Sequence, residues 1–226
     1  MKNIYCLLIV SFLCIFSLLP AGAQTLSEKD FQVLNMNDGL SDNDIHSVAK
    51  DTEGFMWFGT GSGLNRYDGH TFKVFRMPGI SYRRIDRVVS LDTDYLLLRS
   101  EQNLFLFDKK YERFLPVCDS VSKQPVMFAD FVADSDGSCW GVSSGELSEV
   151  NFPSSYVQDT AFVSVRHVVN NSQSDPFVVL CMGADGKMLY CASRNGTVYC
   201  FTPGQKQLKK VCDGQLSSSK WVSSVL

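Results

Sequence analysis

Several features of metal-binding, redox-active and nucleic-acid-binding proteins are missing from this 226-residue sequence. It has only three histidines, none within a few residues of a cysteine, and no two cysteines form a Cys-x-x-Cys pair. A zinc centre or a thioredoxin-like redox site therefore has no support, and we expect no metal ion and no cofactor. The lysines and arginines form no basic block and the formal net charge is −3, so nucleic acid is not an expected partner.

Long apolar runs are also scarce, and the one that occurs lies at the N-terminus. Lys2 precedes an uncharged run from Ile4 to Leu19, and the small residues Ala21 and Ala23 follow it. This pattern predicts a secretory signal peptide over residues 1–23, cut before Gln24. An uncleaved membrane anchor is the alternative, but the run is shorter than the roughly 20 apolar residues of a spanning helix. We expect export to the periplasm, with no membrane segment after the signal peptide.

Helical periodicity is nearly absent from the rest of the chain. Short apolar runs alternate with Asp-Gly, Asn-Gly and Gly-Ser-Gly turn signals, which is typical of an all-β fold. The runs also repeat: residues 39–45 recur as residues 79–85, forty positions later. A third copy aligns Trp57 with Trp140, and a looser fourth copy follows from about residue 161.

Each copy contains four strand-sized pieces, which in the first copy span residues 45–49, 55–60, 63–67 and 71–75. Four antiparallel strands in about forty residues make one propeller blade. The expected fold class is an all-β propeller fragment of about four four-stranded blades, incomplete at the C-terminus. A β-sandwich is the alternative, although it needs no internal repeat. The expected blades are residues 39–77, 79–117, 122–153 and 161–212, with the start of a further blade at 216–226.

The first copy carries a specific motif. Residues 40–45 read Leu-Ser-Asp-Asn-Asp-Ile, residues 51–60 read Asp-Thr-Glu-Gly-Phe-Met-Trp-Phe-Gly-Thr, and residues 63–69 read Gly-Leu-Asn-Arg-Tyr-Asp-Gly. This motif resembles the two-component regulator propeller repeat. The resemblance implies the N-terminal periplasmic sensor part of a hybrid two-component histidine kinase, in a family whose ligands are typically oligosaccharides. The kinase itself is not present in this chain.

The motif residues are expected to have structural roles. An aromatic residue on a second strand packs between blades, and Asp and Gly form the turn between first and second strands. The residues assigned to this structural motif are Asp51, Gly54, Trp57, Gly59, Gly63, Tyr67, Asp68 and Trp140.

Ligand contacts are expected where propeller geometry gathers loops on one face. The connections between blades and the turns between second and third strands emerge together there. Aromatic and planar hydrogen-bonding side chains in these loops suit a sugar, and Tyr-Arg-Arg also suits a sulfated or uronic ligand. The candidate ligand-binding residues are Asn43, Asp44, Tyr82, Arg83, Arg84 and Trp221.

No catalytic set is expected in this chain, which is not predicted to be an enzyme. His46, His70 and His167 fall at unrelated positions of the repeat, and the acidic residues lie mostly in turns. The favoured function is an oligosaccharide-sensing propeller that relays to a kinase, with the rest of its propeller and a homodimer as further partners. A stand-alone secreted propeller that binds carbohydrate or protein is one alternative, and a propeller lyase or hydrolase is another.

The sequence also predicts one hairpin register. Asn195-Gly196 lies between two strand-like runs and favours a two-residue type I′ turn. That register sets Cys191 opposite Cys200 as a non-hydrogen-bonded pair, with Cα atoms about 4.5 Å apart. This separation lies within the range of a disulfide, and export makes oxidation feasible.

Overall fold

The computed structural model describes residues 31–78, 84–92, 94–133, 139–153, 156, 159–170, 175–183 and 186–213. The chain divides into two compact units, Met1–Val33 and Leu34–Leu226, and nearly all described residues belong to the second. The predicted signal peptide at 1–23 and the predicted further blade at 216–226 lie outside the described residues. Within the described part of the chain, no helix has the length and apolar character needed to cross a membrane.

The first blade is the four-stranded antiparallel sheet β1-β2-β3-β4. Its strands lie within about one residue of the positions expected from the motif, because turn residues separate the apolar runs sharply. A short 3-10 helix, Met36–Asp38, precedes them. The strands are β1 (Ile45–Lys50), β2 (Met56–Thr60), β3 (Gly63–Tyr67) and β4 (Phe72–Phe75).

Twelve further strands follow in the same order. The second blade contains β5 (Arg87–Ser90), β6 (Tyr95–Ser100), β7 (Asn103–Asp108) and β8 (Arg113–Asp119). The third contains β9 (Asp130–Ala133), β10 (Cys139–Ser143), β11 (Glu146–Asn151) and β12 (Ala161–Asn170). The fourth contains β13 (Phe177–Met182), β14 (Leu189–Ser193), β15 (Val198–Thr202) and β16 (Gln207–Cys212).

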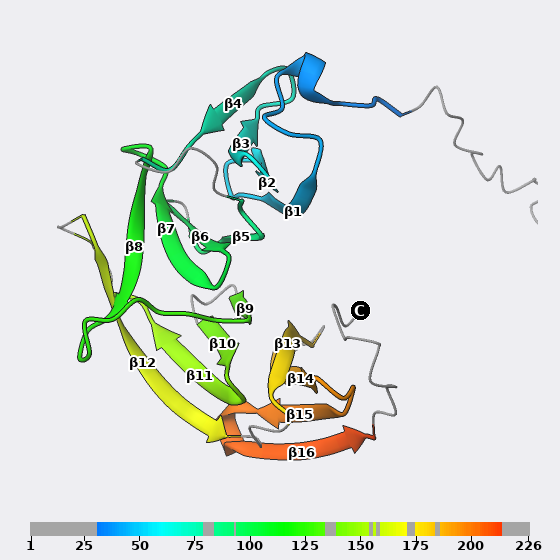
Figure 1. Cartoon of the computed structure of the whole chain (residues 1–226), viewed down its shortest axis with the longest axis vertical. Coiled ribbons are helices and arrows are strands. Elements are labelled where there is room, and N and C mark those ends of the chain that lie inside the picture. The colour runs from blue at the N-terminus through cyan, green and yellow to red at the C-terminus, as the bar shows by residue number, and fades with distance from the viewer. Residues whose placement is uncertain are drawn as a thin grey trace, which may run out of the picture. The chain divides into compact units, whose positions relative to one another are not determined.

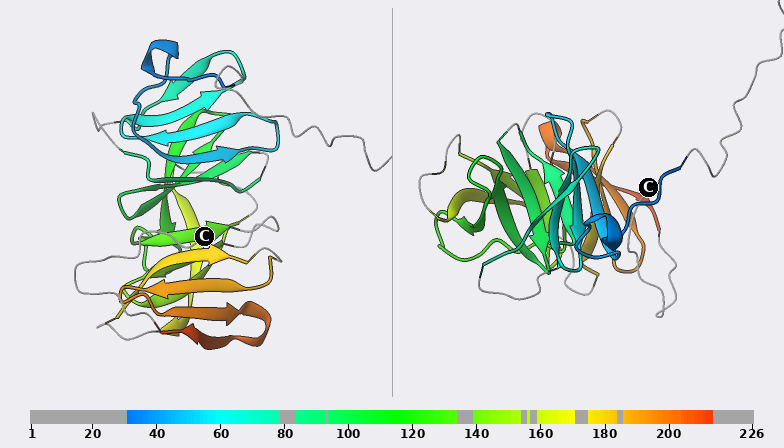
Figure 2. Two further views of the ribbon diagram at one scale, coloured as in Figure 1. Left: turned by 90° about the vertical axis from the view of Figure 1, so that its right-hand side faces the viewer. Right: turned by 90° about the horizontal axis from the view of Figure 1, so that it is seen from above.

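The four blades are arranged as in a β-propeller, so the expected fold class is confirmed. The first strands β1, β5, β9 and β13 contact their neighbours in sequence and lie on the inner side in Figure 1. Figure 2 shows the sheets following one another along residues 34–213. Side chains fill the spaces between the sheets, which is how a blade buries a face that it cannot bury alone.

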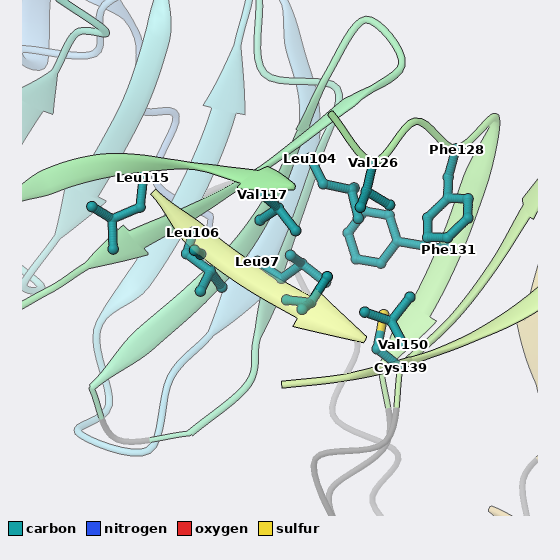
Figure 3. Packing of buried hydrophobic residues seen from close by; sticks show 12 residues of the cluster. Leu97, Leu104, Leu106, Leu115, Val117, Val126, Phe128, Phe131, Cys139 and Val150 are labelled. Atoms are coloured by element: carbon teal, nitrogen blue, oxygen red, sulfur yellow. The ribbon is translucent and has the colours of Figure 1, made fainter. Parts of the chain in front are cut away.

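The core between the second and third blades shows this packing in detail. Leu97 and Leu106 of the second blade meet Phe131 and Val150 of the third, and Val126 reaches the same cluster from the connection between them (Figure 3). All five side chains are at least nine-tenths buried. Similar clusters join the first blade to the second and the third to the fourth.

The structure corrects the boundary between the third and fourth blades. We expected residues 161–212 to form the fourth blade, with its first strand ahead of a polar insertion at residues 170–175. Instead β12 pairs antiparallel with β11 and is the fourth strand of the third blade. The first three residues of β12 also pair in parallel with the end of β8, so the second and third blades form one eight-stranded sheet.

The predicted hairpin register is wrong by one residue. Ser193 donates its amide to the carbonyl of Thr197, and Gly196 has a φ of 86°, so the loop has three residues and ends in a bulge. Cys191 consequently pairs with Tyr199, while Cys200 pairs with Tyr190. Residues directly opposite share a face and successive residues alternate, so Cys191 and Cys200 point to opposite faces of the sheet. Both are free thiols.

Candidate functional site

The two ligand candidates in the first blade, Asn43 and Asp44, are engaged within their own loop. The Asn43 side-chain oxygen accepts a 2.9 Å hydrogen bond from the Met36 amide. The Asp44 carboxylate lies 3.2 Å from Nε2 of His46, although the Asp44 side chain remains largely exposed. Asn43 therefore fixes the loop that leads into the first blade, and most of the Asp44 side chain is exposed to solvent.

Of the other four ligand candidates, Arg84 is the one that the structure describes. Arg84 forms a close ion pair with Asp86, next to the start of β5. Tyr82, Arg83 and Trp221 lie outside the described residues. A ligand site composed of all six predicted residues thus stays a prediction.

The aromatic motif residue Trp57 is held by a buried carboxylate. Its indole Nε1 donates a 2.8 Å hydrogen bond to Asp51, which also accepts from the amides of Glu53 and Phe55. Lys109 of the second blade lies 3.4 Å from the same carboxylate and is itself buried. Burial raises the pKa of Asp51, but the Trp57 bond and the Lys109 charge outweigh burial and hold it below its usual value.

The motif glycines lie where backbones approach each other. A Cβ at Gly59 would be 2.7 Å from the carbonyl oxygen of Ile85, at the junction with the second blade. Gly63 has a φ of 133°, which side chains rarely adopt. Gly54 has a φ of 93° in the turn that Asp51 begins. These geometries are those of structural positions.

The remaining motif residues also bond locally. Tyr67 donates its hydroxyl to the carbonyl of Gly69, and Asp68 accepts from the amides of His70 and Thr71. Those bonds lower the pKa of Asp68 to about 2. Trp140 is buried, with its ring centroid 5.5 Å from that of Phe201 in the fourth blade.

A pocket of about 280 Å³ lies where the second and third blades meet. Three segments line it: the connection at 119–128, the β10–β11 turn with the start of β11 at 143–148, and residues 165 and 167 of β12. An inter-blade connection and a turn between second and third strands come together here. These are the two loop types that the sequence analysis assigned to the ligand-binding face.

The connection is folded tightly onto the sheet. The Asp119 amide donates to the carbonyl of Gln124, and the Val126 amide donates to the carbonyl of Val117. The Asp119 carboxylate accepts a 2.8 Å bond from the Ser122 amide. The hydrogen bonds from Ser122 hold the pKa of Asp119 below its usual value, so Asp119 is an anionic acceptor at neutral pH.

The far wall of the pocket depends on Phe128. Its ring lies against Gly141 of β10, where any Cβ would overlap the ring. The Phe128 amide donates to the carbonyl of Gln102 in the β6–β7 turn, which ties the connection to the second blade. The glycine at 141 therefore allows the pocket wall to form.

Polar groups of the third blade complete the site. His167 Nδ1 lies 2.9 Å from the Ser148 hydroxyl and 3.1 Å from Glu146 Oε2. Both partners approach the same ring nitrogen, whereas a catalytic triad uses one nitrogen for the nucleophile and the other for the carboxylate. The cluster thus differs from a triad and presents a hydroxyl and a carboxylate at one point.

Residues 141–145 read Gly-Val-Ser-Ser-Gly and match the Gly-x-Ser-x-Gly pattern of hydrolases, contrary to the expectation that the chain has no catalytic set. A nucleophile elbow joins a strand to a helix. Here Ser143 ends β10, and a tight turn leads directly into β11. The pattern therefore forms part of a hairpin on the pocket rim.

His167 and the 119–128 connection were not predicted as site residues. The available signal was the repeat itself, because Ser144 and Gly145 occupy the places of Gly61 and Ser62, a turn already assigned to the ligand-binding face. Among the described residues, no group of three or more His, Cys, Asp or Glu side chains is placed to hold a metal ion.

Comparison with known proteins agrees with this architecture. Residues 39–62 match the family model of the two-component regulator propeller, so the chain carries such a repeat. Over 78 residues it is 38% identical to histidine kinase P4 of Formosa agariphila, a match that spans 34% of this chain and 5% of that protein.

Two solved structures from B. thetaiotaomicron share the fold. The extracellular domain of the predicted hybrid two-component system BT3049 has a TM-score of 0.60 at 16% identity, covering 80% of this chain and 26% of that one. The extracellular domain of the predicted one-component system BT4673 has a TM-score of 0.57 at 17% identity, covering 80% and 27%. This chain thus spans about a quarter of each solved structure.

Proposed function

We propose that this chain is the ligand-binding propeller of an exported sensor, and that it recognises an oligosaccharide in the pocket between its second and third blades. The observation that carries the proposal is the convergence of Asp119, Glu146, Ser148 and His167 around one pocket on the loop face. Hydroxyl-rich ligands need several fixed acceptors and donors at once, and these side chains supply both.

The pocket also offers apolar surface beside its polar groups. Met127 is about half exposed on the connection, and Pro125 and Val165 lie nearby in the lining. A sugar ring presents C–H faces as well as hydroxyls, so a mixed lining suits it. The pocket volume of about 280 Å³ is at the small end for ligand sites, which fits one or two sugar units of a longer chain.

We further propose that this chain is part of the periplasmic sensor of a two-component system. Ligand binding to that sensor is relayed to a histidine kinase. The propeller repeat at 39–62 and the 38% identity to a histidine kinase support this proposal. The predicted signal peptide supports export. Mass measurement of protein secreted to the periplasm should give a mature chain beginning at Gln24, and an intact N-terminus at Met1 would contradict export by cleavage.

Binding measurements test the pocket directly. Calorimetry with the purified chain and a panel of tetrasaccharides should identify at least one ligand. Glu146→Gln should weaken its binding about tenfold, because the amide retains the shape but removes the anionic acceptor. Glu112→Gln is the matched control, since Glu112 pairs only with the exposed Lys73 among its described ion-pair partners. Equal affinity of the two variants would overturn the pocket assignment.

A further inference from the structure

Two arginines of the second blade face each other near the same loop face. Arg87 on β5 and Arg99 on β6 are direct cross-strand partners. Like charges in directly opposite positions repel each other, so this pair destabilises the sheet unless anions compensate it.

The described carboxylates compensate the pair only in part. Asp130 of the third blade lies 3.0 Å from Arg87 but 3.9 Å from Arg99, beyond hydrogen-bond distance. Its second oxygen accepts a bond from the Leu180 amide of the fourth blade. Each Asp130 oxygen therefore already has a nearer partner than Arg99, which is Arg87 for one and the Leu180 amide for the other.

A second carboxylate, Asp86, is also occupied nearby. It pairs with Arg84 and accepts a 2.7 Å bond from the Glu101 amide. Among the described residues, three guanidinium groups thus stand against two carboxylates, which leaves one positive charge in excess.

Arg99 carries that excess. Its Nε atom is buried and has no hydrogen-bond partner among the described residues, and neither has the buried hydroxyl of the adjacent Ser100. Burial lowers the pKa of the Arg99 guanidinium, against the opposing charges of Asp130 and Asp86. A desolvated guanidinium without its full set of acceptors costs free energy, which a bound anion would recover.

The arginine pair is adjacent in structure to the oligosaccharide pocket. Three residues beyond Arg99, the carbonyl of Gln102 accepts from the amide of Phe128 in the pocket wall. Asn103 forms a β-bridge with Met127 of the same wall. The wall then leads within two residues to Asp130. One extended ligand can therefore reach both places.

We propose that the ligand is an acidic oligosaccharide, whose carboxylate or sulfate group binds Arg99 and Arg87 while a neutral unit occupies the pocket. This rests on the proposed function. The orientation follows from charge, because Asp119 and Glu146 of the pocket repel an anionic group and accept hydrogen bonds from hydroxyls. Arginine suits the role, since its planar fork matches carboxylate and sulfate oxygens.

Calorimetry with three sets of tetrasaccharides tests the inference: neutral (cello- and mannotetraose), uronate without sulfate (oligogalacturonate) and sulfated without uronate (keratan sulfate). We expect binding from the uronate or the sulfated set, and the set that binds distinguishes the two anionic groups. Arg99→Gln and Arg87→Gln should each weaken that binding about tenfold or more. Lys73→Gln, which removes an exposed charge in the first blade, should leave it unchanged.

Arg99→Lys keeps the positive charge but removes the planar guanidinium, so it should give an intermediate affinity. Thermal melts identify any variant that fails to fold. Neutral tetrasaccharides that bind as tightly as acidic ones, or acidic binding that Arg99→Gln and Arg87→Gln leave intact, would overturn this inference and leave the proposed function standing. Failure of every oligosaccharide set to bind would overturn both.

Discussion

The indole of Trp57 and the carboxylate of Asp51 form a 2.8 Å hydrogen bond inside the first blade, and Lys109 of the second blade approaches the same carboxylate. Asp51→Asn removes the charge that balances buried Lys109, so we expect a loss of about 1–3 kcal/mol in the free energy of unfolding. Urea denaturation monitored by Trp fluorescence measures it. The exposed Asp159 is a matched control, and Asp159→Asn should change stability by less than about 0.5 kcal/mol.

The same carboxylate predicts a pH dependence. The pKa of Asp51 is lower in the folded protein than its ordinary value, because hydrogen bonds and Lys109 outweigh burial. Its contribution to stability is therefore present above about pH 4 and is lost as the pH falls through the lowered pKa. Urea midpoints between pH 7 and pH 3 should fall less steeply for Asp51→Asn than for the unsubstituted chain. Parallel curves would contradict this contribution.

Gly141 should be intolerant of any side chain. A Cβ there would overlap the buried Phe128 ring, so Gly141→Ala should cost about 1–3 kcal/mol and displace the pocket wall. Gly204, whose Cβ would meet nothing within 4 Å, provides the control Gly204→Ala. The melting temperature and the oligosaccharide affinity should both fall for Gly141→Ala and should not change for Gly204→Ala. A Gly141→Ala protein with unchanged stability would show that Phe128 is placed differently.

The cysteines should differ widely in reactivity. Burial raises the pKa of the Cys139 and Cys191 thiols to about 12, which leaves almost no thiolate at neutral pH, while Cys212 is exposed. Brief alkylation of the native reduced chain should label Cys212 before either buried thiol, and Cys212→Ser should remove the fast phase. Peptide mapping of oxidised protein should find no Cys191–Cys200 bond, and finding one would restore the register that the structure contradicts.

The parts of the fold that were predictable from the sequence are those set by local chemistry. In the first blade, apolar alternation and turn residues place each strand, and the cross-blade role of Trp57 follows from its position on a second strand. The assignment of β12 was not predictable in this way. Whether a strand ends one blade or begins the next depends on its pairing with β11, and neither composition nor period carries that information.

The candidate site was harder to predict from the sequence for a similar reason. Asn43 and Asp44 have side chains that suit a ligand, but loop closure already uses the side chain of Asn43. His167 falls at an unrelated position of the repeat, and its partners, Ser148 and Glu146, become its neighbours only through the β11–β12 register. The predicted register of the hairpin at Asn195 is wrong because the same Asn-Gly signal occurs in two turn types, one with two loop residues and one with three.

Backbone pairing between β8 and β12 has a mechanical consequence for the proposed function. The first and second blades are joined by contacts such as the Val88 amide with the Ser47 hydroxyl, and the third and fourth by the Leu180 amide with Asp130. The second and third blades share one hydrogen-bonded sheet, so they resist sliding apart and move as one rigid unit. If a ligand binds there as proposed, it would not open a hinge between these two blades. Any movement that it caused would instead occur at the two interfaces on either side, where side chains and single hydrogen bonds join the blades.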